Sequence, residues 1–368
     1  MKKAILSLLL ALPAAGAAAQ NAGGGISADL LAKLRAGRTE QAADRALRNA
    51  LATNSINALA ANPAARQARD TYFSNRVESK GITDQKQSGR CWLFTGLNVM
   101  RAKVIARFGM GDFRFSQNYC FFYDQLEKAN LFLQAIIDNA DKPMDDRTVN
   151  WLFQHPLSDG GQFTGIQDII SKYGVVPADV MPETYSAENT STMAQLLSLK
   201  LREYGLALRK SAAAGEKTDA LQEQKAAMLA TVYDILAECL GEPPLKFTWT
   251  RHTADGRPAG TKEYTPLSFY EEYVGTDLKN NYVMLMNDPT RPYHKTYTID
   301  LDRHVYDGSN WTYINLPIEE IKAMAIASIK DSTMMYFSCD VGKFIDARNG
   351  WLDPNNYDYA SLFDTSFP

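Results

Sequence analysis

The sequence has 368 residues, of which 45% are hydrophobic and 22% are charged, and its formal net charge is -3. A chain of this length can bury a sizeable core, either as one elaborated domain or as two domains. It contains no run of Lys and Arg that would follow a phosphate backbone, which argues against nucleic acid as a partner.

The first residues have the order of a secretory signal peptide. Lys2 and Lys3 precede an apolar stretch from Ala4 to Leu12, and a small-residue segment with an A-x-A pattern ends at Ala19. The apolar stretch is too short to span a bilayer, and a buried N-terminal helix is the less favoured alternative. We therefore expect residues 1–19 to be a signal peptide and the protein to be exported, periplasmic or extracellular, with no membrane contact after removal of the signal.

Three helical regions are expected before residue 247. The Ala-rich segment from Ile26 to about Arg69 predicts one or two amphipathic surface helices. Turn-forming residues 81–90 precede a segment from Cys91 to about Phe108 that is apolar around most of its circumference, which predicts a buried helix. Apolar residues at steps of three and four between Asn189 and Glu242 predict two antiparallel helices that form an insertion.

From about Phe247 the pattern changes to short β-prone runs separated by turn residues. Strands are expected at Phe247–Trp249, Tyr282–Met286, Thr296–Ile299 and Trp311–Leu316. A helix is then expected at Glu319–Lys330 and a further strand around Met334–Cys339.

The four cysteines lie far apart, at positions 91, 120, 239 and 339. Their spacing is not that of a disulfide framework, and with four single His residues it is not a zinc pattern. Cys239 lies on an apolar stripe and is expected in the core. If Cys91 is free, at least one of the other three thiols is free too.

The stretch around Cys91 has the properties of a nucleophile site. A cysteine attacks carbonyl carbon as the thiolate, which the backbone N–H groups and dipole of a helix N-terminus favour. Acyl transfer also needs donors for an oxyanion, and Gln85 lies six residues earlier across a Gly-containing turn. The alternative for Cys91 is a small buried hydrophobic residue.

The run QxxxGxCWxF, from Gln85 to Phe94, resembles the active-site signature of papain-like cysteine peptidases. The motif alone is also compatible with transglutaminase-type enzymes, which place a Cys-Trp at the start of a buried helix. Further blocks in the same order resemble the bleomycin hydrolase and aminopeptidase C branch: Phe115–Tyr119, Asp159–Gln162, Lys172–Pro177, Asn287–Pro289, Arg291–Lys295 and Cys339–Lys343. The resemblance extends from about Ile26 to Pro368.

This resemblance implies that Cys91 is the nucleophile and Gln85 the oxyanion donor. It places Gly160 and Gly161 along the substrate cleft, where glycine lets a peptide approach the main chain, although a plain turn is the alternative. Trp92 is counted with the substrate-binding residues. The implied activity is that of an aminopeptidase, which cleaves peptide substrates without a metal or an organic cofactor. The implied assembly is a homo-hexamer.

The catalytic His and Asn of the family are not found, because both lie beyond the block that matches Cys339–Lys343 and the sequence stops at Pro368. His294 followed by Asn310 imitates their order but lacks the family motif. A truncated version of a longer enzyme is favoured over a natural chain that has lost the chemistry. Truncation predicts an incompletely covered sheet and exposed apolar surface.

The expected fold is therefore α+β and papain-like, with a helical subdomain, a β-rich subdomain whose C-terminal part is missing, and a helical insertion at about 189–242. The expected domains are an N-terminal helical extension over 20–70 and a peptidase domain over 71–368. Two rivals are an exported scaffold or binding protein with an inactive cleft, and a transglutaminase-type acyl transferase or amidase, which the two glycines of the cleft argue against.

Overall fold

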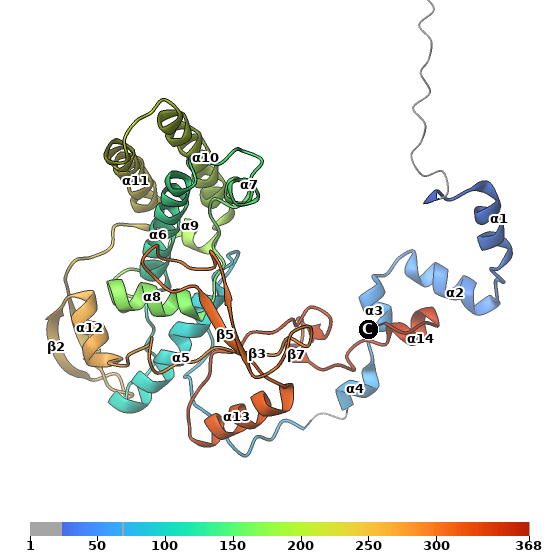
Figure 1. Ribbon diagram of the computed structural model, residues 1–368. Coiled ribbons are helices and arrows are strands. Elements are labelled where there is room, and N and C mark those ends of the chain that lie inside the picture. Colours follow the sequence, from blue (N-terminus) through green and yellow to red (C-terminus); the bar gives the residue numbers. More distant parts are fainter. Residues whose placement is uncertain (1–23, 68–69, 368) are drawn as a thin grey trace, which may run out of the picture. The chain divides into compact units, whose positions relative to one another are not determined.

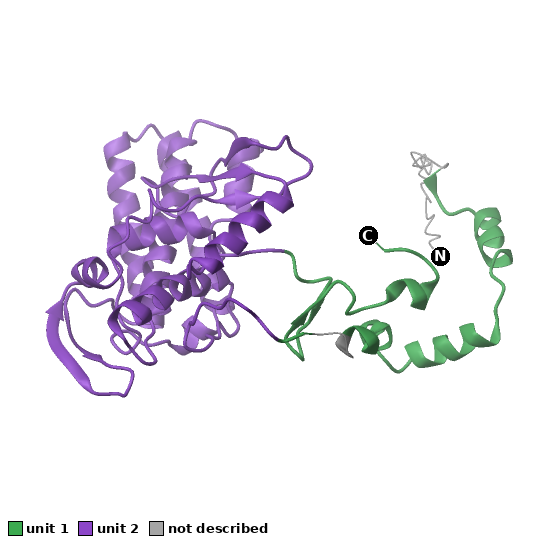
Figure 2. Ribbon diagram, turned by 90° about the horizontal axis from the view of Figure 1, so that it is seen from below, with its two compact units in different colours: residues 1–71, 340–368 green, residues 72–339 purple. Residues whose placement is uncertain are grey.

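A computed structural model of the chain describes residues 24–67 and 70–367. The expected signal peptide, residues 1–19, lies outside the described residues. The chain forms two compact units, one made of residues 1–71 with 340–368 and the other of residues 72–339 (Figure 2). The expected domain boundary at residue 70 stays a prediction. In the structure the first unit begins with the N-terminal residues but also takes in the end of the chain.

The first unit consists of short elements from both ends of the chain. Its helices and strands are α1 (Ala28–Ala36), α2 (Ala42–Leu51), α3 (Ile56–Ala60), α4 (Pro63–Gln67), β6 (Ile345–Asp346), β7 (Trp351–Leu352) and α14 (Tyr359–Phe363). The two ends meet where the Tyr359 hydroxyl donates to the Asn57 side chain at 2.9 Å and α14 contacts α3. The Ala-rich segment thus forms several short, largely exposed helices.

The second unit contains the helical core. Its first seven helices are α5 (Cys91–Phe108), α6 (Gln117–Asp138), α7 (Arg147–Gln154), α8 (Phe163–Tyr173), α9 (Tyr185–Glu188), α10 (Ser191–Ala213) and α11 (Thr218–Leu240) (Figure 1). The helix expected from Cys91 is confirmed, and it ends at Gly109, whose φ of 59° is the left-handed conformation that commonly stops a helix. The two expected antiparallel helices are confirmed as α10 and α11, which pack on α6.

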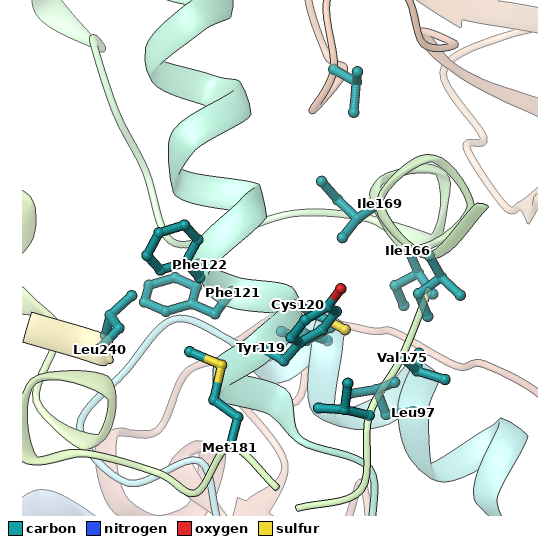
Figure 3. Packing of buried hydrophobic residues seen from close by; sticks show 14 of the residues in the cluster. Leu97, Tyr119, Cys120, Phe121, Phe122, Ile166, Ile169, Val175, Met181 and Leu240 are labelled. Carbon is teal, nitrogen blue, oxygen red and sulfur yellow. The ribbon is translucent and has the colours of Figure 1, made fainter. Parts of the chain in front are cut away.

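The core lies where α5, α6 and α8 meet. Figure 3 shows the side chains of Leu97 from α5, Cys120 and Phe121 from α6, and Ile166 and Ile169 from α8 gathered around one another. Each of these side chains is buried. The helix that begins at Cys91 is therefore anchored on two sides, and its first turn is held in a defined position.

The β-rich part of this unit is small. β1 (Phe247–His252) and β2 (Pro258–Tyr264) pair antiparallel, and α12 (Pro266–Tyr273) follows. A second sheet has the order β3-β5-β4, in which β5 (Trp311–Asn315) is antiparallel to β4 (Lys295–Ile299) and parallel to β3 (Leu285–Met286). α13 (Ile318–Lys330) comes after this sheet.

The strand expected around Met334–Cys339 is wrong, since residues 333–340 form no strand. Tyr336 instead packs against Phe163 of α8, with 5.5 Å between ring centroids. Apolar side chains are exposed on α13, none of whose residues is buried and whose Met324 and Ile326 are about half exposed. The expected truncation stays a prediction.

Within residues 24–67 and 70–367, no helix combines the length and the apolar character needed to cross a bilayer. All four cysteines are free: Cys91 and Cys339 are exposed, Cys120 is buried, and Cys239 is partly buried against the core.

Candidate active site

Cys91 is the first residue of α5 and its side chain is exposed, while the next two residues, Trp92 and Leu93, are buried. Arg90 is the N-cap residue of the helix, and its side chain makes no hydrogen bond to the first turn. Its carbonyl accepts from the N–H groups of Leu93 and Phe94, both at 3.0 Å. The first backbone N–H groups of a helix have no partner within the helix. An accessible sulfur thus lies beside backbone donors and the positive end of a helix dipole.

The loop before Cys91 is held together by Gln85 and Ser88. The Gln85 amide donates to the Ser88 carbonyl at 2.5 Å, and the Ser88 hydroxyl donates to the Gln85 carbonyl at 2.6 Å. An amide nitrogen carries two N–H groups. Among the described residues the second N–H has no hydrogen-bond acceptor, so this half-buried side chain can still donate to a ligand.

Arg90 fixes the start of the helix from inside the protein. Its side chain is fully buried, pairs with Glu183 at 2.7 Å and lies over the rings of Phe94 and Phe121, at 5.1 Å from each centroid. A buried guanidinium needs such partners to offset its loss of hydration.

Asp159 attaches the Gly160–Gly161 segment to the start of α5. Its carboxylate accepts from the Gly89 N–H and from the Thr190 hydroxyl, both at 2.6 Å, and its backbone carbonyl accepts from the Trp92 indole N–H at 2.9 Å. The approach is so close that a Cβ at Gly89 would lie 2.3 Å from the Asp159 carboxylate. Residues 70 positions apart in sequence are thus brought together beside Cys91.

The two glycines are not equivalent. A Cβ on Gly161 would lie 2.2 Å from the His304 ring and 2.9 Å from the Trp92 ring, whereas the nearest atom to a Cβ on Gly160 is 3.4 Å away. Gly161 is therefore required by packing against Trp92 and His304. Both glycines are half buried, so a ligand can reach this segment.

Trp92 does not have the exposure expected of a substrate contact. Only 1% of its surface is accessible, because its ring packs against His304 with centroids 4.6 Å apart. In the structure Trp92 supports Asp159 and Gly161 from inside, and its expected role in substrate binding stays an untested prediction.

Beneath Trp92 lies a buried polar cluster that sequence reasoning missed. The Asp124 carboxylate contacts His304 Nδ1 at 2.5 Å and Lys128 Nζ at 2.9 Å. Burial opposes ionisation of Asp124, yet the charge of Lys128 and the hydrogen bond with His304 hold its pKa below the usual range. Burial lowers the pKa of His304. A neutral His304 that donates from Nδ1 to an ionised Asp124 is consistent with both directions.

Tyr336 is a second residue that the sequence did not single out. Burial and the nearby charge of Cys91 raise the pKa of the Tyr336 phenol to about 12. The residue belongs to the segment in which a strand was wrongly expected, and it adds a hydroxyl to the neighbourhood of the sulfur.

The remaining histidines lie elsewhere. His294 is 63% exposed and pairs with Glu320 of α13 at 2.9 Å. The exposed His155 packs on Trp151, and His252 ends β1. Among the described residues, none of the four histidines hydrogen-bonds to Cys91. The alternative that His294 and Asn310 act as the catalytic His and Asn gains no support from these contacts.

The family model described as Peptidase C1-like matches residues 25–368. The chain belongs to this family. It is 37% identical over 321 residues to aminopeptidase C of Lactobacillus delbrueckii subsp. lactis, covering 87% of this chain and 71% of the relative. It is 39% identical over 295 residues to bleomycin hydrolase of Mus musculus, covering 78% of this chain and 65% of the relative. The chain thus spans about two thirds of these relatives.

The crystal structure of PepW from Lactobacillus rhamnosis HN001 is similar to this Peptidase C1-like chain with a TM-score of 0.90 at 38% identity. The match covers 94% of this chain and 78% of PepW. The expected papain-like α+β fold, the expected branch and the cysteine peptidase class are confirmed by these relatives and by the family match. The roles of Cys91, Gln85, Gly160 and Gly161 stay predictions.

Proposed function

We propose that this chain hydrolyses peptide bonds through a thioester formed on Cys91. The observation that carries the proposal is the exposed sulfur at the N-terminus of α5, beside the half-buried Gly161 segment. The relatives named aminopeptidase C and bleomycin hydrolase support the same class of reaction. The name aminopeptidase C also supports peptide substrates and removal of N-terminal residues, although this finer specificity is part of the proposal.

The chemistry follows from the geometry. The Cys91 sulfur attacks the carbonyl carbon and forms a C–S bond, and the carbonyl oxygen becomes an oxyanion that the Cys91 N–H and the free Gln85 N–H stabilise. The C–N bond then breaks and the amine leaves with one proton. Water hydrolyses the thioester, which releases the acid and restores the thiol.

A peptidase needs a proton donor for the leaving amine, whereas a binding protein with a reactive thiol does not. Papain-like enzymes use a His for this step, and no described histidine hydrogen-bonds to Cys91. This observation favours, as a second candidate, a binding protein with a reactive thiol that does not turn over.

The test uses the full chain under reducing conditions. A peptidyl chloromethyl ketone with a free N-terminus should add one adduct, measured by intact mass, and Cys91→Ser should abolish it. Cys339→Ser is the matched control, because Cys339 is also exposed. Release of an aminoacyl fluorophore would establish the peptidase. Labelling of Cys91 without turnover would support the binding protein, and an absence of Cys91 labelling would refute both.

Assembly and location are finer parts of the proposal. The resemblance suggests a homo-hexamer, which mass photometry can check, with a monomer as the contradicting result.

The residues before Gln20 suggest export. Expression in a Gram-negative host followed by N-terminal sequencing should find Gln20 first in the periplasmic fraction, whereas an intact N-terminus in the cytoplasm would contradict export.

A further inference from the structure

We propose that Lys128 is a positioning residue that orients the Gly160–Gly161 peptide, so that the Gly161 N–H is free to pair with the backbone of a bound peptide. The inference rests on the function proposed above, since it concerns how the same cleft holds its ligand. Nothing in the sequence around Lys128 marks it, and its role comes from contacts with a segment about 30 residues further along the chain.

Lys128 uses its whole hydrogen-bonding capacity on this segment and on Asp124. Its Nζ lies 2.9 Å from the Ser158 carbonyl, 2.7 Å from the Gly160 carbonyl and 2.9 Å from the Asp124 carboxylate. An ammonium has three N–H groups, and here each has one acceptor. The side chain is only 12% exposed. A buried ammonium is costly without partners, so these contacts fix its position.

The direction of the Gly161 N–H follows from the contact with Gly160. In a trans peptide the carbonyl of one residue and the N–H of the next point in opposite directions. Because Lys128 of α6 holds the Gly160 carbonyl, the Gly161 N–H points away from this ammonium. Within the described part of the chain this N–H has no acceptor, and the residue is half buried. An unpaired donor is thus presented on the segment that adjoins Trp92, next to Cys91.

In the direction that a Cβ on Gly161 would take, Trp92 and His304 leave no room for the extra atom. His304 is itself held by Asp124, the residue that pairs with Lys128. The Gln125 amide adds a donor to the Ser158 carbonyl at 3.1 Å. The segment is thus held by hydrogen bonds from α6 and by packing against two rings, which limits rotation of the Gly160–Gly161 peptide.

The test compares two reagents that attack the same sulfur. Iodoacetamide requires only an accessible thiolate, whereas a peptidyl chloromethyl ketone also requires the cleft to bind its backbone. In Lys128→Met we expect the second-order rate with the peptidyl reagent to fall about 10- to 100-fold, the effect of losing a hydrogen bond to a charged donor. The loss should appear as a higher KI, while the rate with iodoacetamide stays within about twofold.

Three further variants make the comparison decisive. Asp124→Asn with Lys128→Met removes the unpaired buried charge, and so keeps the test valid if Lys128→Met alone does not fold. Lys128→Arg should restore part of the peptidyl rate. Lys172→Met is the matched control, because Lys172 also pairs with α6, through Glu127 at 2.7 Å, but makes no contact with residues 158–161.

The outcomes separate the two proposals. If the wild-type thiol reacts with the peptidyl reagent no faster than with its non-peptidyl analogue, the cleft itself is refuted and the positioning role with it. If the wild type shows the preference and Lys128→Met retains it, only the positioning role is overturned. Equal losses with both reagents would also overturn it, because they would show general damage to the fold.

Discussion

At the scale of single residues, the site combines features that a local motif can encode with features that it cannot. Gln85 and Cys91 lie within seven residues, so their relation to the start of α5 could be predicted from sequence. His304 contacts Asp124 across 180 positions, and no local pattern marks either residue. Both were missed because tertiary folding alone brings them together.

The two glycines of the cleft should respond differently to a methyl group. Gly161→Ala would force a Cβ to within 2.2 Å of His304, whereas Gly160→Ala meets only the Ser158 hydroxyl, at 3.4 Å. We expect Gly161→Ala to lower the free energy of unfolding by about 1–3 kcal/mol, as overpacking typically does, and Gly160→Ala to change it much less. Urea denaturation of both variants provides the measurement. Equal losses would show that packing does not distinguish the two positions.

His304 should make the protein less stable as the pH falls from 7 to 5. Burial lowers its pKa in the folded state, so below the usual histidine value of about 6.5 the unfolded chain binds a proton that the folded chain does not. Stability is therefore retained above that pH and lost below it. Asp124 also has a lowered pKa, but its loss begins only near pH 4.

The measurement is the urea midpoint of wild type and His304→Gln across this range. The variant should be less stable at pH 7 but should show a flatter decline. Asp302, whose pKa is raised by burial, acts in the opposite direction and is present in both proteins. Parallel declines in the two proteins would assign the pH dependence to other groups.

At the scale of elements, long apolar periodicity made several helices predictable from sequence. α5, α10 and α11 were anticipated because each repeats its pattern over many residues. The strand expected near Tyr336 failed because a strand requires a hydrogen-bonded neighbour, and residues 333–340 have none among the described strands. β2, rich in polar residues, carried too little β-pattern to be predicted, although it pairs with β1.

The packing of α5 on α8 offers a test at this scale. A Cβ on Gly96 would lie 1.9 Å from Ile166 Cδ1 and 3.1 Å from Cγ1, so Gly96→Ala should destabilise the protein by about 1–3 kcal/mol. Ile166→Val removes the closest atom. In a double-mutant cycle we expect the combined loss to be smaller than the sum of the single losses. Additive losses would show that the two helices do not meet at this pair.

At the scale of the whole molecule, a helical core carries the site, while the β-rich part leaves apolar surface exposed. α13 has no buried residue, and Met324 and Ile326 are 48% and 56% exposed. Large contiguous apolar surfaces commonly mark contacts with other protein. The fold of the core could be anticipated from a resemblance, whereas the degree of exposure of α13 required the structure.

The exposed face of α13 predicts self-association of this chain. Met324→Lys combined with Ile326→Lys should lower association in analytical ultracentrifugation and leave the free energy of unfolding within about 0.5 kcal/mol, as for other surface substitutions. Leu245→Lys is the matched control, since Leu245 is 83% exposed away from this helix and should change neither quantity. A loss above about 2 kcal/mol in the double variant would show that this face is covered, because only a buried position makes a new charge that costly.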